Sequence, residues 1–158
     1  MKIYNFVTIW RVEAPIESVW NAIYHANDWP TWWKGVESVS ELRKGDEKGI
    51  GGVHRYTWKS KLPYRLSFDM QTVRVEPPVL LEGIATGELQ GRGQWQLSTA
   101  GNETVVRYDW RVETTKLWMN LISPLARPLF EWNHDVVMNW GAQGLAQRLG
   151  ANVVPEKH

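Results

Sequence analysis

The sequence of 158 residues contains no cysteine, which excludes disulfide bonds, thiolate metal ligands and a cysteine nucleophile together. An excess of charge of one sign is also missing, because 18 lysines and arginines are balanced by 17 aspartates and glutamates. Binding to nucleic acid or to an anionic membrane depends on a strong basic excess, so the balance argues against both partners. The length corresponds to one domain.

Long apolar runs are lacking as well. The N-terminal residues 1–15 lack the unbroken apolar stretch of a signal peptide. The most apolar region, 117–130, is interrupted by Asn120, Pro124, Arg127 and Pro128 and is too short to cross a bilayer. We therefore expect no integral membrane segment, and the absence of cysteine favours a cytoplasmic protein.

Tryptophan, by contrast, is abundant: the chain has 11, against three phenylalanines. A tryptophan side chain can bury about 150–250 Å² of surface, and its indole N–H needs a hydrogen-bond partner when it is buried. So many large rings with polar edges suit the wall of a cavity as well as a packed core.

Apolar residues repeat with a period of two through most of the chain, which indicates an antiparallel sheet. The expected strands are 1–14, 36–43, 52–60, 64–76, 79–88, 91–99 and 104–115. Helical spacing predicts an amphipathic helix over 15–26, a short helix ending near Gly35 and a long helix over about 128–149. In the long helix, Leu129, Trp132, Val136 and Trp140 form the expected buried stripe.

This order of elements predicts an α+β fold. A curved antiparallel sheet of about seven strands carries two short helices after its first strand and is covered on one face by the long C-terminal helix. We expect a single domain over 1–150, followed by a C-terminal tail over 151–158.

Several sequence motifs carry a resemblance to a known superfamily. Residues 12–20 read VEAPIESVW and residues 29–33 read WPTWW, and TGELQGRGQW at 86–95, VRYDW at 106–110 and WNHD at 132–135 follow. With these motifs the whole chain resembles the START-like, helix-grip proteins of the SRPBCC superfamily, which groups polyketide cyclases, dehydrases and lipid-transport proteins. The resemblance implies a sheet wrapped around the long helix with an elongated apolar cavity between them. Members bind lipids, sterols, polyketides or hormones, and a minority catalyse cyclisation or dehydration.

Strand parity and helical spacing select the side chains that face such a cavity. The expected ligand-binding residues are Trp10, Tyr56, Trp58, Phe68, Met70, Trp95, Tyr108, Trp110, Trp132, Asn133, Val136 and Trp140. For any single one of them, plain core packing is the better explanation. As a set, their N–H and O–H groups are hard to satisfy in a close-packed core, whereas a ligand cavity with a few polar groups accommodates them.

No catalytic residue can be assigned from the sequence. His54 shares the parity of Tyr56 and Trp58, and His134 lies about 140° from the centre of the expected helix stripe, toward a flank or solvent. The histidines stand in separate elements without a supporting group of carboxylates, so we expect neither a metal nor another cofactor. Gly91 and Gly93 lack the further glycine and the following helix of a phosphate loop.

The leading interpretation is therefore a protein that binds a hydrophobic small molecule, such as a lipid, an aromatic compound or a polyketide, in an internal cavity. One alternative is an enzyme resembling polyketide cyclases and dehydratases, in which tyrosine or amide groups stabilise an enolate. A second is a protein-interaction module of the same fold, with Trp32, Trp33 or Trp118 in an exposed apolar patch. The sequence specifies no oligomeric state.

Overall fold

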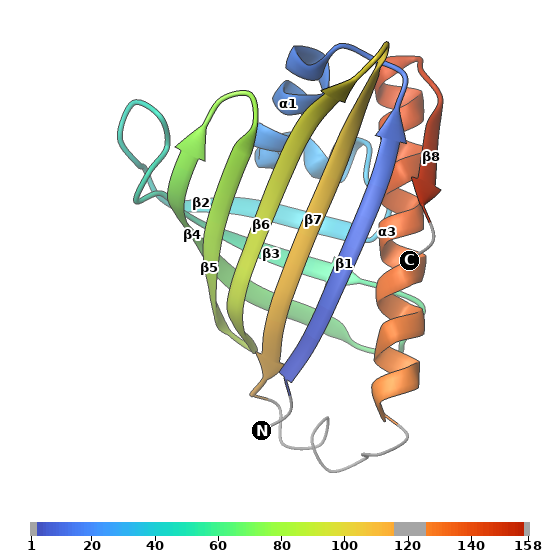
Figure 1. Cartoon of the computed structure of the whole chain (residues 1–158). Coiled ribbons are helices and arrows are strands. Elements are labelled where there is room, and N and C mark those ends of the chain that lie inside the picture. Colours follow the sequence, from blue (N-terminus) through green and yellow to red (C-terminus); the bar gives the residue numbers. More distant parts are fainter. Residues whose placement is uncertain (1–2, 116–125, 157–158) are drawn as a thin grey trace.

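The computed structural model describes residues 3–115 and 126–156 of the chain. The elements in these two segments follow one another as shown in Figure 1. They are β1 (Ile3–Val12), α1 (Ile16–Tyr24), the 3₁₀ helix η1 (Ala26–Thr31), β2 (Val36–Arg43), β3 (Val53–Lys59), β4 (Arg65–Glu76), β5 (Leu80–Gly87), β6 (Leu89–Ala100), β7 (Glu103–Thr114), α3 (Ala126–Leu149) and β8 (Val153–Glu156).

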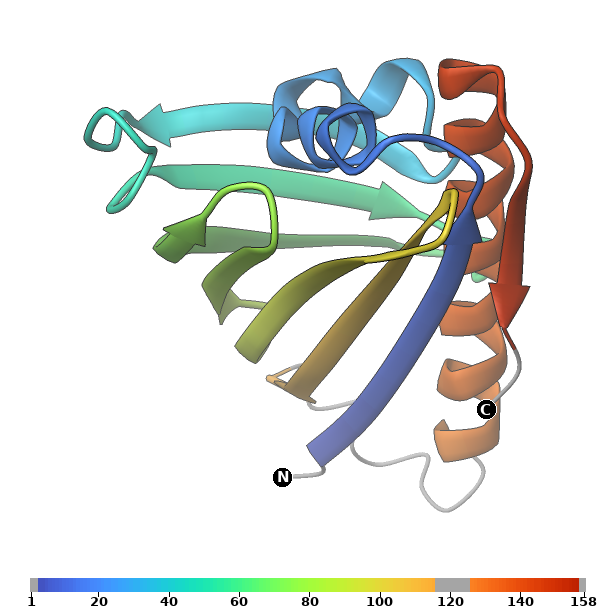
Figure 2. The same ribbon diagram turned by 45° about the horizontal axis from the view of Figure 1, so that its top comes forward.

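The eight strands form one sheet in the order β2-β3-β4-β5-β6-β7-β1-β8, and every neighbouring pair is antiparallel. The sheet is strongly curved: β1, β7, β6 and β5 lie on the near side in Figure 1, while β2, β3 and β4 pass behind them. α3 runs along one side next to β1 and β8, and α1 and η1 cover one end (Figure 2). The α+β helix-grip architecture expected from the sequence is confirmed.

The period of two located the strands closely, because alternating residues face the concave side of the sheet and solvent in turn. β2 has the predicted bounds, and β3, β4, β5 and β7 differ from the prediction by one residue at most at each end. β8 was not expected as a strand: it lies in the segment 151–158 treated as a tail, and it pairs with β1 at Val12↔Val153.

The two short helices follow local signals. Pro15 precedes the first turn of α1 in an extended conformation, and its missing N–H removes no helical hydrogen bond. The segment after α1 forms the 3₁₀ helix η1, and just beyond its end Trp33 N donates to Trp29 O at 2.7 Å. This turn brings Trp29 and Trp33 into the core.

α3 buries a different face from the one predicted. Its buried side chains are Phe130, Met138, Ala142 and Leu145, whereas Leu129 and Trp132 are 39% and 47% exposed. At about 100° per residue the centres of the two faces lie roughly 180° apart, on opposite sides of the helix. The predicted stripe is therefore wrong, because α3 carries large apolar residues on several sides and periodicity alone did not identify the one that meets the sheet.

Two glycines allow α3 to pack closely against the η1 region. A Cβ at Gly141 would lie 2.6 Å from the Trp33 ring, and a Cβ at Gly144 would lie 1.7 Å from the backbone oxygen of Trp32. Trp33 Nε1 also donates a hydrogen bond of 2.9 Å to Val137 O. α3 is thus fixed to the start of β2 as well as to β1 and β8.

None of the helices in the described segments is long and apolar enough to cross a membrane.

Candidate functional site

The concave side of the sheet encloses two adjoining cavities, which we call the inner and outer compartments. The inner compartment has a volume of about 150 Å³ and lies between α3 and the strands β1, β3, β4, β6 and β7. The outer compartment has a volume of about 400 Å³ and lies between the end of α1, η1 and the strands β3 to β7. Five side chains line both compartments and form the boundary between them: Trp29, Trp58, Phe68, Trp95 and Tyr108.

The boundary is a cluster of packed rings. Tyr108 stacks on Trp95 with ring centroids 4.1 Å apart, and Trp29 contacts Trp95 edge-on at 6.1 Å. Trp33, from the inner side, meets Trp58 edge-on at 5.2 Å. Such ring contacts add to area burial, so the boundary is well supported.

The inner compartment is mostly apolar but contains polar atoms without partners. Tyr4 Oη, Trp58 Nε1 and Asn133 Oδ1 are buried and make no hydrogen bond with the part of the chain that the structure describes. Phe6 stacks on His134 at 4.1 Å, and the two rings form part of the wall. A buried polar group without a partner is unfavourable by about 1–3 kcal/mol, so each is a position where a bound molecule gains a hydrogen bond.

The outer compartment presents hydroxyl and imidazole groups. His54 and Tyr56 from β3, Thr72 from β4 and Tyr108 from β7 line it, and Glu41 lies opposite His54 across the β2–β3 pair. Tyr108 Oη lies over Gly93, where a Cβ would come within 2.6 Å of it. Gly93 therefore gives the phenol room against the sheet.

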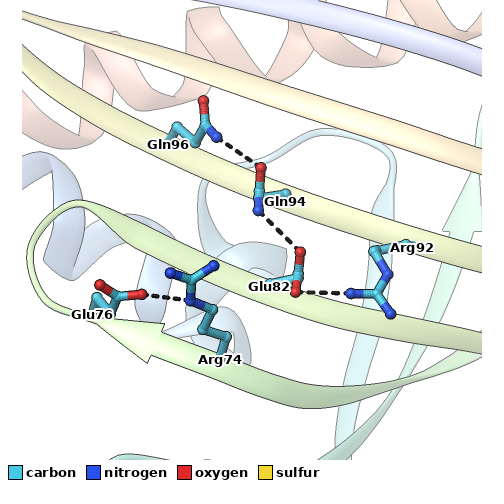
Figure 3. A network of polar contacts seen from close by, with 6 residues as sticks. All are labelled: Arg74, Glu76, Glu82, Arg92, Gln94 and Gln96. Atoms are coloured by element: carbon cyan, nitrogen blue, oxygen red, sulfur yellow. Dashed lines mark hydrogen bonds and ion pairs between the residues drawn. The ribbon is translucent and has the colours of Figure 1, made fainter.

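Glu82 also borders the outer compartment, but its carboxylate is engaged on the other face of the sheet. It accepts hydrogen bonds from Arg92 at 2.9 Å and Gln94 at 3.0 Å, and Gln96 donates to Gln94 at 2.7 Å (Figure 3). Gly83, the next residue, alternates to the concave face and pairs with Gly93. The Glu82 network thus lies on the convex surface. On the concave side of the same two strands, Gly83 and Gly93 line the compartment.

Most of the sequence-predicted ligand-binding residues are brought together at these two compartments. Tyr56 and Met70 line the outer one, Trp110 and Asn133 line the inner one, and Trp58, Phe68, Trp95 and Tyr108 line both. Strand parity explains the position of the seven strand residues, since a residue on the concave face of a curved sheet faces the enclosed space.

Four predicted residues lie elsewhere. Trp10 is fully buried and packs edge-on against Trp33 at 5.7 Å without reaching either compartment. Trp132 is exposed, and the half-buried Val136 and Trp140 lie outside both linings, with Trp140 under the Lys34 ammonium at 4.7 Å. Trp132, Val136 and Trp140 were predicted to line the cavity because periodicity assigned the wrong buried face to α3.

The observed buried face of α3 also changes the expected position of His134. It lines the inner compartment together with Phe130, Val137 and Met138 instead of lying at a flank. Tyr4, also missed, has the parity of Phe6 on β1, and this signal could have placed it on the concave face. Spacing alone could not have selected Phe130, because Leu129 fits an apolar stripe equally well.

The tryptophans expected in an exposed patch do not form one in the described segments. Trp33 is 2% exposed, and Trp32 is partly buried against the core. Trp118 lies outside the described residues.

Burial dominates the electrostatics of the phenols. It raises the pKa of Tyr56, and it raises that of Tyr108, to which the neighbouring Tyr56 adds. Burial also raises the pKa of Tyr64 to about 12, with smaller contributions from Tyr4 and Glu88. Tyr56, Tyr64 and Tyr108 therefore stay protonated at neutral pH and can donate hydrogen bonds.

Burial lowers the pKa of His54 below its ordinary 6.5, and Glu41 opposes this change in part. The unfolded chain binds the proton more tightly than the folded one, so we expect the free energy of unfolding to fall as the pH drops below about 6.5. His54→Gln should flatten this part of the stability–pH profile, measured by thermal unfolding between pH 5 and 8. In an NMR titration Glu41→Gln should lower the His54 pKa further. A His54 pKa above 6.5 in the parent would contradict this placement.

No group of three or more metal-ligating side chains comes together in residues 3–115 and 126–156.

Comparison with known proteins adds two findings. A family model described as polyketide cyclase / dehydrase and lipid transport matches residues 12–138. No curated protein matches the sequence.

Solved structures share the fold. The chain is similar to the aromatase/cyclase ZhuI of Streptomyces sp. R1128, with a TM-score of 0.74, 13% identity and 94% of each chain covered. It is similar to a START superfamily protein of Mycobacterium smegmatis, with a TM-score of 0.73, 12% identity, 94% of this chain and 97% of that chain covered. For the protein TTHA0849 of Thermus thermophilus the TM-score is 0.74 at 17% identity, with 92% of this chain and 97% of that chain covered.

Proposed function

The chain belongs to the polyketide cyclase/dehydrase and lipid-transport family, and from this premise we propose that it binds a hydrophobic small molecule in the cavity between sheet and α3. One observation carries the proposal: three buried polar atoms, on Tyr4, Trp58 and Asn133, line the apolar inner compartment without a hydrogen-bond partner among the described residues. An apolar pocket with a few convergent polar groups is the usual form of a small-molecule site.

The volumes support a ring-containing ligand. A cavity of about 150 Å³ lined by apolar side chains is large enough for a benzene-sized ring. The inner compartment has this size, and the outer one, at about 400 Å³, adds room for a longer molecule. The aromatic walls of both offer stacking partners for flat rings. A cytoplasmic location stays a prediction from the sequence.

The test uses Asn133 and a matched control on the same helix. Isothermal titration calorimetry should detect saturable binding of 2-naphthol, and Asn133→Leu should weaken it roughly fivefold by removing one hydrogen bond. Because the same change removes a buried polar atom without a partner, the melting temperature should stay the same or rise. Asn139→Leu, at an exposed position of α3, should leave the affinity unchanged.

Native mass spectrometry of the purified protein checks the proposal without a chosen probe, since a small molecule that copurifies appears as a discrete added mass. Absence of copurified ligand together with no saturable binding of 2-naphthol or of unsubstituted naphthalene would refute the proposal.

A second candidate function is catalysis of a cyclisation or dehydration. It is favoured by His54, Tyr56 and Tyr108 lining the outer compartment together. A neutral imidazole can accept a proton next to a carbonyl, and phenols can stabilise the enolate that forms. Incubation with a poly-ketone mimic, followed by mass spectrometry, distinguishes the two. Product that disappears in His54→Ala while binding persists would establish catalysis, and an unchanged mimic favours binding alone.

A further inference from the structure

The outer compartment contains two phenol groups whose hydroxyls have no role in the fold. Tyr56 is 8% exposed and its ring lies between Phe68, at 6.0 Å, and Trp29, at 5.5 Å. The Tyr108 ring is held on Trp95, and its hydroxyl lies over Gly93. Neither hydroxyl makes a hydrogen bond with another residue in the described segments.

The carboxylate side chains and the two histidines, His25 and His54, are the titratable groups besides the phenols that line this compartment. Glu41 and Asp28 stand exposed at its edge, and the Glu82 carboxylate is engaged with Arg92 on the convex face. The described residues that line the two compartments include no lysine and no arginine. Arg127, an exposed residue, contacts the Tyr4 ring at 4.9 Å and donates to Ile3 O at 3.1 Å, at the far end of the inner compartment.

A pair of phenol donors in a lining that holds no lysine or arginine among the described residues favours one kind of ligand group. A carboxylate moved out of water into this site would lose its hydration without gaining an opposite charge, and Glu41 and Asp28 would repel it. A ketone, ester or similar neutral oxygen has no charge to desolvate and accepts a hydrogen bond from each phenol.

We propose that the outer compartment is a subsite for an uncharged oxygen acceptor, held by the hydroxyl groups of Tyr56 and Tyr108, and that it discriminates against carboxylates. This inference rests on the proposed function and specifies its ligand: a largely apolar molecule that carries a neutral carbonyl group, not a free fatty acid or another organic anion. Burial raises the pKa of both phenols and lowers the pKa of His54, which lines the same compartment, so the phenols stay protonated and His54 stays neutral above about pH 6.5. The discrimination should persist above this pH and weaken as His54 gains a proton.

Three probes on one ring system test the subsite by isothermal titration calorimetry: naphthalene, 2-acetylnaphthalene and 2-naphthoate. The parent should bind 2-acetylnaphthalene at least about tenfold more tightly than 2-naphthoate, as expected for an unpaired buried charge. Tyr56→Phe and Tyr108→Phe should each weaken 2-acetylnaphthalene about three- to tenfold, the effect of one hydrogen bond. Binding of naphthalene, which has no oxygen, should change less than about twofold in either variant.

The probe set separates the two proposals. If 2-naphthoate binds as tightly as 2-acetylnaphthalene, or if both phenylalanine variants keep the parent's affinity for the ketone, the subsite is refuted while the binding function stands. If none of the three probes binds, the proposed function itself fails. Removing an unpaired hydroxyl leaves the ring packing intact, so both variants should melt like the parent, and the melting temperature verifies that each is folded.

Discussion

Replacing Leu145 with alanine is expected to lower the free energy of unfolding by about 2–5 kcal/mol, the range for a leucine truncated in a closed core. Leu145 has no exposed surface and lies on the face of α3 that packs against the rest of the molecule. The truncation removes apolar contacts and leaves a cavity that the surrounding side chains fill only in part. Chemical denaturation followed by tryptophan fluorescence measures the change.

Leu129→Ala provides the matched control, since it is the same substitution in the same helix. Leu129 is 39% exposed, so its truncation should lower the free energy of unfolding by less than about 1 kcal/mol. A larger loss at Leu129 than at Leu145 would mean that α3 buries the face predicted from periodicity and not the observed one.

The second large effect is expected at Gly144, and its sign is opposite to that suggested by helix propensity. In an exposed helix interior, glycine to alanine stabilises by about 1 kcal/mol. At Gly144 the added methyl group would lie 1.7 Å from Trp32 O, a backbone atom that cannot rotate away. Gly144→Ala should therefore lower the free energy of unfolding by about 2 kcal/mol or more, because α3 and the η1 region must move apart.

Gln143→Ala controls for the general effect of alanine in this part of α3. Gln143 is exposed, and the substitution should change the stability by less than about 0.5 kcal/mol. Thermal and denaturant unfolding of both variants against the parent give the comparison. A Gly144→Ala variant as stable as the parent would show that the close approach of α3 to Trp32 is absent.

The substitutions at Leu145 and Gly144 both test how α3 packs against the rest of the molecule. Leu145 tests which face of α3 is buried, and Gly144 tests how near that face comes to its neighbour. Both matter for the site, because Asn133 and His134 reach the inner compartment only when α3 has this rotation.

The sequence by itself determined the strands and their faces. The alternation of Val106, Tyr108, Trp110 and Val112 requires one face of β7 to be buried, and a shift by one residue would reverse every side chain. The order of elements and the motifs that resemble the superfamily then determined the architecture. This local information sufficed to bring Trp58, Trp95 and Tyr108 to the cavity.

The tertiary structure alone decided the rest. A helix with apolar residues on several sides can bury any of them, so the packing partners of α3 chose Phe130 and Leu145 over Leu129 and Trp132. How deeply a residue lies within the concave face also depends on distant segments. Trp10 and Trp95 both stand at concave-facing positions of their strands, yet Trp10 packs against Trp33 and only Trp95 borders a compartment.

For the polar groups of the site, too, the sequence determined one part and the tertiary structure decided the other. Parity placed Tyr56 and Tyr108 on the concave face, but it could not show that their hydroxyls lack partners, because a hydrogen bond depends on every element that packs nearby. The facing of His54 and Glu41 comes from the β2–β3 register, and the space for the Tyr108 phenol comes from Gly93 on another strand. Short-range periodicity contains none of these distances, since each is set by chain segments that meet only when the sheet closes around α3.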